Sequence, residues 1–345
     1  MQYVELGRTG LRVSRLCLGT MNFGDRTDEK QSFAIMDRAL EAGINFFDTA
    51  DRYGTPMGEG VTEQIIGRWL AQGDRRDRIV LATKVYGPMG PGANNRGSSA
   101  YHLRRGCEAS LRRLHTDHID LYQMHHVDRG VIAPHHRQAV GEQVQFVDLP
   151  HLTPGAPWEE IWQAMEYLVL AGKISYVGSS NFAAWNIVQA CEAARARHFL
   201  GLVSEQSVYN LAKRHVELEV IPACRAYGVG FVCWSPLAGG LLAGRDARAP
   251  SNARRSGIKL DPGQERQVAA FESLCSEMGE HPANVALAWL IRNPVVTAPI
   301  VGPRTLEQLD DALRALEVKL SDDVMRRLDG IFPGLGGEAP MAYAW

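Results

Sequence analysis

The stretch Ile44-Asn-Phe-Phe-Asp-Thr-Ala-Asp-Arg-Tyr-Gly54 sets the interpretation of the whole chain. Its first half is a short apolar run with the length of a buried strand, and Asp48 stands where that run turns polar. Tyr53 follows on the next turn, so an anion and a phenol leave the same strand end. The alternative interpretation is purely structural: Asp48 caps the following turn, and Tyr53 is incidental.

The same pattern of apolar run and helical segment repeats along the chain. Short β-rich runs are expected near 16–19, 44–48, 79–84, 119–125, 174–179, 202–206, 230–235 and 298–302. Amphipathic helices are expected at 31–42, 62–70, 101–114, 157–171, 183–194, 216–227, 265–278 and 282–292. Alternating strands and helices favour a parallel sheet, and about eight strands close a TIM barrel.

A doubly wound sheet is the alternative arrangement. It is disfavoured because no Gly-x-Gly-x-x-Gly follows the first strand, and the chain lacks Gly-x-x-x-x-Gly-Lys-Ser/Thr. Residues 1–14 alternate around Gly7-Arg-Thr-Gly10, which predicts a β-hairpin ahead of the barrel. We therefore expect one α/β domain over 1–345, a (β/α)8 TIM barrel with an N-terminal hairpin, an insertion after strand 4 at 130–155 and a C-terminal tail at 333–345.

Composition and charge narrow the classes of partner. The 345 residues are 45% hydrophobic, which is ample for a core, and the net charge of −2 provides no broad basic field for nucleic acid or an anionic membrane. The amino terminus has no signal pattern, and no apolar run reaches membrane length. The six cysteines include no Cys-x-x-Cys pair and are typical of reduced core residues. A cytoplasmic location is expected.

Polar residues collect at the predicted strand ends. In a closed parallel barrel the side chains just beyond the strand carboxyl ends converge on one face. Here those residues are Thr20, Met21, Asp48, Tyr53, Lys84, His125, His126, Ser179, Ser180, Asn181, Gln206, Trp234, Ser235, Gly302, Pro303 and Arg304. An acid, a lysine and a histidine at successive strand ends indicate a functional site more than a structural coincidence.

The chemistry of this set fits proton delivery to a developing alkoxide. A free phenol titrates near ~10, but a nearby ammonium such as Lys84 would stabilise the phenolate of Tyr53. Asp48 would keep Lys84 charged and in place, and His125 would orient a substrate carbonyl. Because no side chain donates a hydride to the carbonyl carbon, a nicotinamide cofactor is implied.

The motifs that carry these residues resemble the aldo-keto reductase superfamily over nearly the whole chain. They are Asp48-Thr-Ala-Asp-Arg-Tyr53-Gly, Thr83-Lys84, Ile119-Asp-Leu-Tyr-Gln-Met-His125, Gly178-Ser-Ser-Asn181-Phe, Gln206 with Tyr209-Asn210, Trp234-Ser-Pro-Leu237 and Ile300-Val-Gly-Pro-Arg304. The resemblance implies an (α/β)8 barrel with NADP(H) extended over its mouth. It also implies that Asp48, Tyr53, Lys84 and His125 form the catalytic tetrad.

The resemblance further implies which residues hold the cofactor. Ser180, Asn181 and Gln206 would hold the carboxamide, and Trp234 would stack on the nicotinamide. Cofactor contacts are also expected from Thr20, Met21, Ser235, Pro236, Leu237, Gly239 and Gly302. Residues 302–311 resemble the adenosine clamp of the branch that contains the potassium-channel β-subunits, which places Arg304, Gln308 and Asp311 around the 2′-phosphate and adenine. Ala312 stands where that clamp has an asparagine.

The substrate class is less closely defined. The segments 123–129 and 204–214 and the Gly-Gly-Glu-Ala-Pro tail are similar to actinomycete deoxysugar and polyketide reductases, including NDP-hexose 2,3-enoyl reductases. We expect a small-molecule carbonyl or conjugated enone, with sugar nucleotides and polyketide intermediates as candidates. A redox-sensing NADP(H)-binding partner subunit with slow turnover is the alternative function, although no docking extension precedes the hairpin. A homo-oligomer is left open.

The insertion and the tail carry their own predictions. The insertion at 130–155 leaves the strand end just after His125, so we expect a hairpin-like flap that walls the substrate pocket, with packing on the outer helices as the alternative. Its histidines have no standard metal spacing, and no metal site is predicted. The tail ends in Tyr343 and Trp345, which we expect to dock near the barrel mouth or on a neighbouring subunit, with disorder as the alternative.

Overall fold

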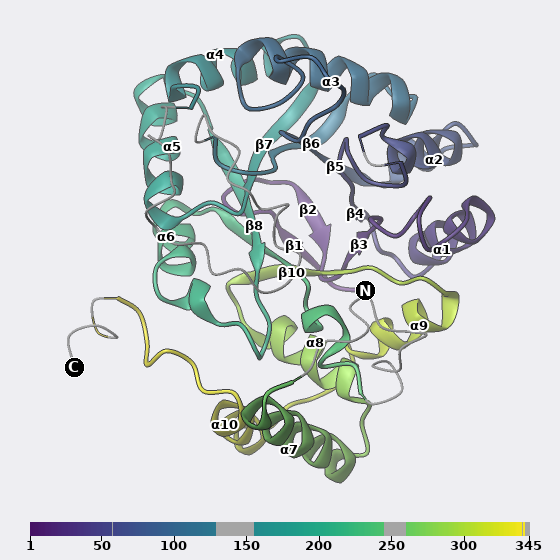
Figure 1. Ribbon diagram of the computed structural model, residues 1–345, viewed down its shortest axis with the longest axis vertical. Helices are drawn as coiled ribbons and strands as arrows, with labels where there is room; N and C mark the ends of the chain where they lie inside the picture. Colours follow the sequence, from purple (N-terminus) through teal and green to yellow (C-terminus); the bar gives the residue numbers. More distant parts are fainter. Residues whose placement is uncertain (57, 129–154, 245–259, 340, 342–345) are drawn as a thin grey trace.

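The apolar runs form a closed parallel barrel. In the computed structural model of the chain the strand order is β10-β3-β4-β5-β6-β7-β8-β9 (Figure 1). The strands are β3 (Cys17–Gly19), β4 (Phe46–Asp48), β5 (Val80–Val85), β6 (Ile119–Met124), β7 (Ile174–Ser180), β8 (Leu202–Val208), β9 (Gly230–Trp234) and β10 (Val296–Val301). The structure describes residues 1–345 apart from 57, 129–154, 245–259, 340 and 342–345. The predicted TIM barrel is confirmed.

Helices cover the outside of this barrel (Figure 1). They are α1 (Glu29–Glu41), α2 (Val61–Leu70), α3 (Ala100–Leu114), α4 (Trp158–Leu170), α5 (Ala184–Ala196), α6 (Val220–Tyr227), α7 (Pro262–Met278), α8 (Pro282–Arg292), α9 (Leu306–Arg314) and α10 (Asp322–Ile331). Their apolar faces join the outer faces of the strands in one large buried cluster, which includes Trp69, Trp162 and Phe271.

Three helical details differ from the sequence prediction. The helix expected over 216–227 is a 3₁₀ turn, His215–Glu217, followed by α6. Pro222 fits only in the first turn of a helix, which explains the late start of α6. The sequence analysis also missed α9 and α10, although each has an N-cap: the side chain of Thr305 accepts from Gln308 N, and that of Ser321 accepts from Val324 N.

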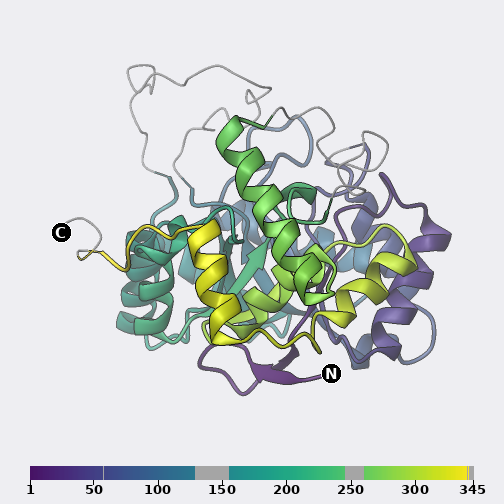
Figure 2. The same cartoon turned by 90° about the horizontal axis from the view of Figure 1, so that it is seen from below.

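The predicted hairpin is confirmed and lies across the amino-terminal end of the barrel. β1 (Tyr3–Glu5) pairs antiparallel with β2 (Arg12–Ser14), and Figure 2 shows the pair at one end of the molecule. Leu6 and Val13 are fully buried in a cluster with inward-facing strand residues. Gly7 has φ +58°, and a Cβ there would collide with the carbonyl oxygen of Val203. The hairpin therefore closes this end, and the opposite end is the barrel mouth.

Further predictions concern cysteines, membrane spans, insertion and tail. All six cysteines, each within the described ranges, are buried free thiols, and burial raises the pKa of Cys107 to about 12. In the described ranges, no helix has the length and apolar character needed to cross a membrane.

Almost all of the 130–155 flap, together with Tyr343 and Trp345, lies outside the described residues. The middle of the tail contacts the region of α6, because Ala339 N donates to Leu218 O at 3.0 Å and Arg225 pairs with Glu338 at 2.6 Å.

Candidate active site at the barrel mouth

A buried acid and a buried lysine meet between two neighbouring strands. β4 ends at Asp48, which is level with Ala82 of β5. Strand side chains alternate between faces, so Lys84 points to the same side as Ala82 and reaches Asp48. Lys84 Nζ donates to Asp48 Oδ2 at 2.6 Å and to Thr49 O at 2.8 Å. With relative exposures of 0% and 3%, the two residues form an ion pair shielded from water.

Tyr53 completes a line of three groups. It lies on the loop after β4, and Lys84 Nζ is 3.4 Å from Tyr53 Oη. The ammonium therefore contacts the carboxylate on one side and the phenol on the other. His125 follows β6 at the same end of the barrel, and its ring packs edge-on against Tyr53 with the centroids 5.8 Å apart. The structure thus brings together all four residues of the predicted tetrad.

Burial and charge set the protonation states of this group. Burial alone would lower the pKa of Lys84, but the charges of Asp48 and Tyr53 and hydrogen bonds to both outweigh it, so the pKa lies above its ordinary value. Burial, followed by the charges of Lys84 and His126, holds the pKa of His125 well below its ordinary value. At neutral pH the lysine is therefore a cation and the histidine is a neutral imidazole, which can donate one hydrogen bond.

Two glutamines hold the second oxygen of Asp48. Gln206 Nε2 donates to Asp48 Oδ1 at 2.8 Å, and Gln123 Nε2 donates to the same oxygen at 3.1 Å. The sequence analysis assigned Gln206 to the cofactor and did not single out Gln123. The signal for Gln123 was its place two residues before His125 on a strand, hence on the same inward face. Asp48 is thus fixed from three sides.

Asn181 connects three strand ends beside the tetrad, those of β6, β7 and β9. Its Nδ2 donates to His125 O at 3.1 Å and to Ser180 Oγ at 2.9 Å, and its Oδ1 accepts from Trp234 Nε1 at 3.1 Å. Asn181 has φ 61°, a left-handed conformation that asparagine tolerates better than most residues. The structure therefore gathers three of the residues predicted for the nicotinamide side, Ser180, Asn181 and Trp234.

A buried glutamate that the sequence analysis missed supports this loop. Glu205 is 0% exposed, and its carboxyl group accepts hydrogen bonds from Phe182 N at 3.1 Å, Ser207 Oγ at 2.6 Å and Ser179 Oγ. Burial raises the pKa of Glu205 to about 7, and the hydrogen bonds offset only part of that effect. No signal in the sequence separates Glu205 from an ordinary strand residue.

The other residues predicted for the cofactor lie around the same mouth. Thr20 donates to Asp48 O through N and Oγ1 at 3.0 and 2.9 Å. Met21 follows it. Asn22 Nδ2 donates to Gly302 O at 2.9 Å, which ties the end of β3 to that of β10. Gln308 is exposed, and its Oε1 accepts from Arg304 N at 2.8 Å. Asp311 is also exposed.

The turn after β9 completes the expected cofactor segment, which includes Pro236 and Leu237. Ser235 has φ 55° and its carbonyl oxygen accepts from Asn210 Nδ2 at 2.9 Å. Gly239 has φ 70° inside the short 3₁₀ turn Ala238–Gly240. Left-handed residues and a glycine allow a ligand to approach this backbone closely. The residues present therefore fit an extended dinucleotide along the mouth.

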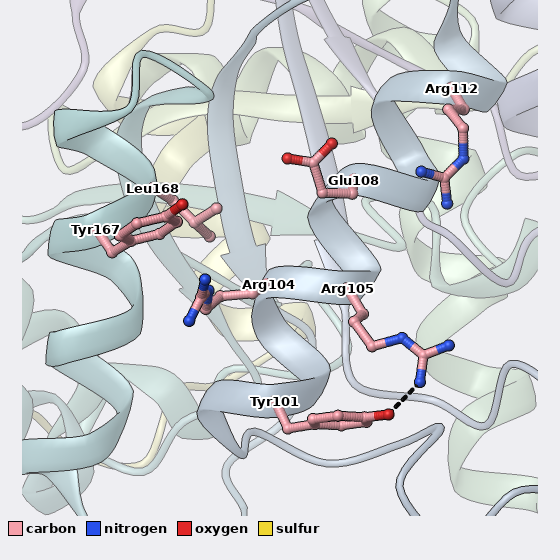
Figure 3. A pocket seen from close by; sticks show the side chains of 7 residues that line it. All are labelled: Tyr101, Arg104, Arg105, Glu108, Arg112, Tyr167 and Leu168. Carbon is pink, nitrogen blue, oxygen red and sulfur yellow. Dashed lines mark hydrogen bonds between the residues drawn. The ribbon is translucent and has the colours of Figure 1, made fainter.

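A hollow of about 470 Å³ lies outside this site, on the outer wall between α3 and α4 (Figure 3). Arg104 lies over the ring of Tyr167 at 4.2 Å, and Arg105 lies over that of Tyr101 at 5.0 Å. All of its lining residues belong to α3 and α4, so it is a groove of the outer wall that includes no residue of the tetrad. The convergence of buried, mutually bonded groups at the mouth is the stronger indication of a functional site.

Comparison with known proteins agrees with the fold. A sequence profile described as "Aldo/keto reductase family" matches residues 15–332. The chain belongs to the aldo/keto reductase family and is an oxidoreductase.

Relatives of this chain have both enzymatic and channel-subunit names. It is 52% identical to the "Uncharacterized oxidoreductase YrpG" of Bacillus subtilis, with 100% of each chain covered. It is 32% identical to a "Probable voltage-gated potassium channel subunit beta" of Oryza sativa, with 96% of each covered. It is also 32% identical to the "Norsolorinic acid reductase stcV" of Emericella nidulans, with 97% of this chain and 82% of that protein covered.

Proposed function

We propose that this protein is an NADPH-dependent reductase of a small-molecule carbonyl compound or conjugated enone. The observation that carries the proposal is Lys84 Nζ, which lies 2.6 Å from Asp48 Oδ2 and 3.4 Å from Tyr53 Oη. A phenol beside a buried ammonium is the arrangement that proton delivery to an alkoxide needs. Norsolorinic acid reductase, a relative over 97% of this chain, supports the reductase assignment.

Each member of the tetrad has a separate role in the proposal. Tyr53 donates its proton to the carbonyl oxygen, and Lys84 stabilises the phenolate that remains. Asp48 holds Lys84 in place. His125, as a neutral imidazole, donates a hydrogen bond that orients the carbonyl oxygen. NADPH, when bound, supplies the hydride that the carbonyl carbon requires.

The proposed cofactor site follows the mouth of the barrel. Ser180, Asn181 and Gln206 hold the carboxamide, Trp234 stacks on the nicotinamide, and 235–239 approaches the pyrophosphate. Arg304, with Gln308 and Asp311, recognises the 2′-phosphate and adenine. The hydrogen bond between Trp234 Nε1 and Asn181 Oδ1 supports this assignment, because it fixes the indole beside the proposed carboxamide site.

A direct assay tests the proposal. The protein is incubated with NADPH and a panel of aldehydes, ketones and enones that includes sugar nucleotides and polyketide-like quinones, and the loss of nicotinamide absorbance is followed. Product analysis then separates carbonyl from carbon-carbon reduction. If no compound on the panel accelerates NADPH oxidation by the protein, the reductase proposal is refuted.

A redox-sensing NADP(H)-binding subunit is the second candidate, and the relatives named as channel β-subunits support it. A sensor would retain oxidised or reduced cofactor long enough to report its state, so product release or chemistry would be slow. Single-turnover measurements distinguish the two functions. A reductase returns to free protein within seconds, whereas a sensor holds the cofactor for minutes or longer.

A further inference from the structure

Arg52 lies one residue before Tyr53 and has a cradle in the next strand-end loop. Gly87 follows the end of β5 and is buried. A Cβ on Gly87 would lie 2.7 Å from Arg52 Cδ and 3.1 Å from both Nε and Nη1. Real Cβ atoms essentially never make such a close contact, so the missing side chain at residue 87 is what lets the guanidinium stem pack there. Arg52 is therefore held in a defined place at the barrel mouth.

The charge of Arg52 acts on His125 of the tetrad. Burial, Lys84 and His126 are the larger influences on the pKa of His125, and Arg52 lowers it further. Arg52 and Tyr53 are consecutive residues of the loop after β4, so this charge belongs to the same part of the barrel mouth as the phenol of the tetrad.

Flat rings continue the wall between these groups. His126 stacks on His125, with the centroids 5.1 Å apart and the planes within 5°, and Tyr86 packs edge-on against His126 at 5.5 Å. Tyr86 adjoins Gly87 in the chain. A substrate whose carbonyl oxygen contacts Tyr53 and His125 would therefore lie along these rings, with Arg52 beside it.

We infer that Arg52 binds an anionic group of the substrate, a carboxylate or a phosphate, and that the enzyme selects anionic carbonyl compounds over neutral ones. This inference rests on the proposed reductase function and names its substrate class. A guanidinium offers a planar fork of donors that matches either anion, and a bond to a charged group is stronger than one to a neutral acceptor. The chain's net charge of −2 provides no general attraction for anions, so the selection is local.

Matched substrates test the role of Arg52. Reduction by NADPH is measured for benzaldehydes that carry a carboxylate at the ortho, meta or para position, each beside the neutral benzaldehyde with a nitro group at the same position. It is also measured for glyceraldehyde phosphate beside glyceraldehyde. We expect Arg52→Gln to lower kcat/KM for the preferred anionic substrate by about 10- to 100-fold, mainly through KM, and for its neutral counterpart by less than about two-fold. The carboxylate and phosphate pairs show which anion is bound.

Two variants separate recognition from general damage. Arg96→Gln removes an exposed arginine from the loop that carries Gly87 and should change neither substrate class. Gly87→Ala should displace the Arg52 guanidinium and reproduce part of the loss for anionic substrates, but it should add nothing in an Arg52→Gln background. Equal losses for anionic and neutral substrates, or no loss for either, would overturn the inference.

A binding measurement keeps this inference distinct from the proposed function. Calorimetry with NADP⁺ present compares terephthalate with para-nitrobenzoate, which lacks the second carboxylate. We expect wild type to prefer terephthalate and Arg52→Gln to lose that preference. If the protein shows this preference but reduces no aldehyde, the inference stands and the reductase proposal fails. If an active enzyme has no such preference and Arg52→Gln affects anionic and neutral substrates equally, the reductase proposal stands and the inference fails.

Discussion

Lys84 Nζ and Tyr53 Oη lie 3.4 Å apart, at the long end of the range for a hydrogen bond. The same ammonium makes much shorter bonds to Asp48 Oδ2 and Thr49 O, at 2.6 and 2.8 Å. Hydrogen bonds of catalytic groups are often long before the substrate arrives and tighten as charge develops. Asp48 and Thr49 thus hold the Lys84 ammonium in place, and its longer contact with the Tyr53 oxygen can shorten as negative charge develops there.

Removal of the Tyr53 hydroxyl should remove most of the carbonyl reduction. General acid catalysis contributes about 10²- to 10⁴-fold, and Tyr53→Phe should lower kcat by that amount with NADPH affinity nearly unchanged. Turnover and NADPH fluorescence titration measure the two quantities. Tyr101→Phe, on the exposed face of α3, is the control. Near-wild-type turnover of Tyr53→Phe would contradict the assignment of the proton donor.

The buried pair of Lys84 and Asp48 should be costly to break from one side. Lys84→Met leaves the Asp48 charge without its ammonium partner, and we expect a loss of about 3–5 kcal/mol in the free energy of unfolding. Urea denaturation measures it. The double variant Lys84→Met/Asp48→Asn removes both charges and should recover part of the loss. If the double variant is less stable than Lys84→Met by the full cost of Asp48→Asn alone, the two side chains are not coupled.

Arg304 should distinguish NADPH from NADH. Its guanidinium can pair with a 2′-phosphate and gains little from a bare hydroxyl, so Arg304→Ala should weaken NADPH binding by about 1–3 kcal/mol and leave NADH binding nearly unchanged. Fluorescence titration with both cofactors measures the difference. Arg326→Ala, an exposed arginine of α10, is the control. Equal losses for the two cofactors would refute the placement.

Glu205 should make stability fall as pH rises. Its pKa is about 7 in the folded protein and 4.5 as an ordinary glutamate, so the folded state holds the proton over that interval. The resulting gain in the free energy of unfolding is complete below pH 4.5 and is lost as the pH rises through 7. The total change is about 3 kcal/mol.

The variant Glu205→Gln has no titrating carboxyl group, so it should lack this pH dependence. Urea unfolding between about pH 5 and pH 8 gives the free energy of unfolding as a function of pH. The plots for wild type and Glu205→Gln should differ in slope below pH 7 and run parallel above it. Glu265→Gln, on the exposed face of α7, controls for the loss of an acidic residue. Curves that stay parallel over the whole range would show that Glu205 has an ordinary pKa in the folded protein.

The sequence by itself determined the barrel and which residues meet at its mouth. Each β-rich run has the apolar composition of a buried strand, and alternation with helices leaves few ways to arrange such strands. Strand ends in a parallel barrel lie on one face, so Asp48, Lys84 and His125 could be assigned to one site before any coordinates. The helices α9 and α10 were missed although the sequence marks both: apolar residues stand at helical spacing, Leu309 and Leu313 in α9 and Val324, Leu328 and Ile331 in α10, and each helix has an N-cap.

Tertiary structure decided how these residues are connected and charged. Asp48 receives bonds from Gln123 and Gln206, which are 75 and 158 residues away, and only the register of the strands brings both amides to one oxygen. The neutral state of His125 and the raised pKa of Glu205 depend on burial by many segments at once. The contact of Arg52 with Gly87 joins two separate loops. Local sequence carries the pattern of a strand or helix, but hydrogen-bond partners and electrostatic environment depend on neighbours that only the closed barrel brings together.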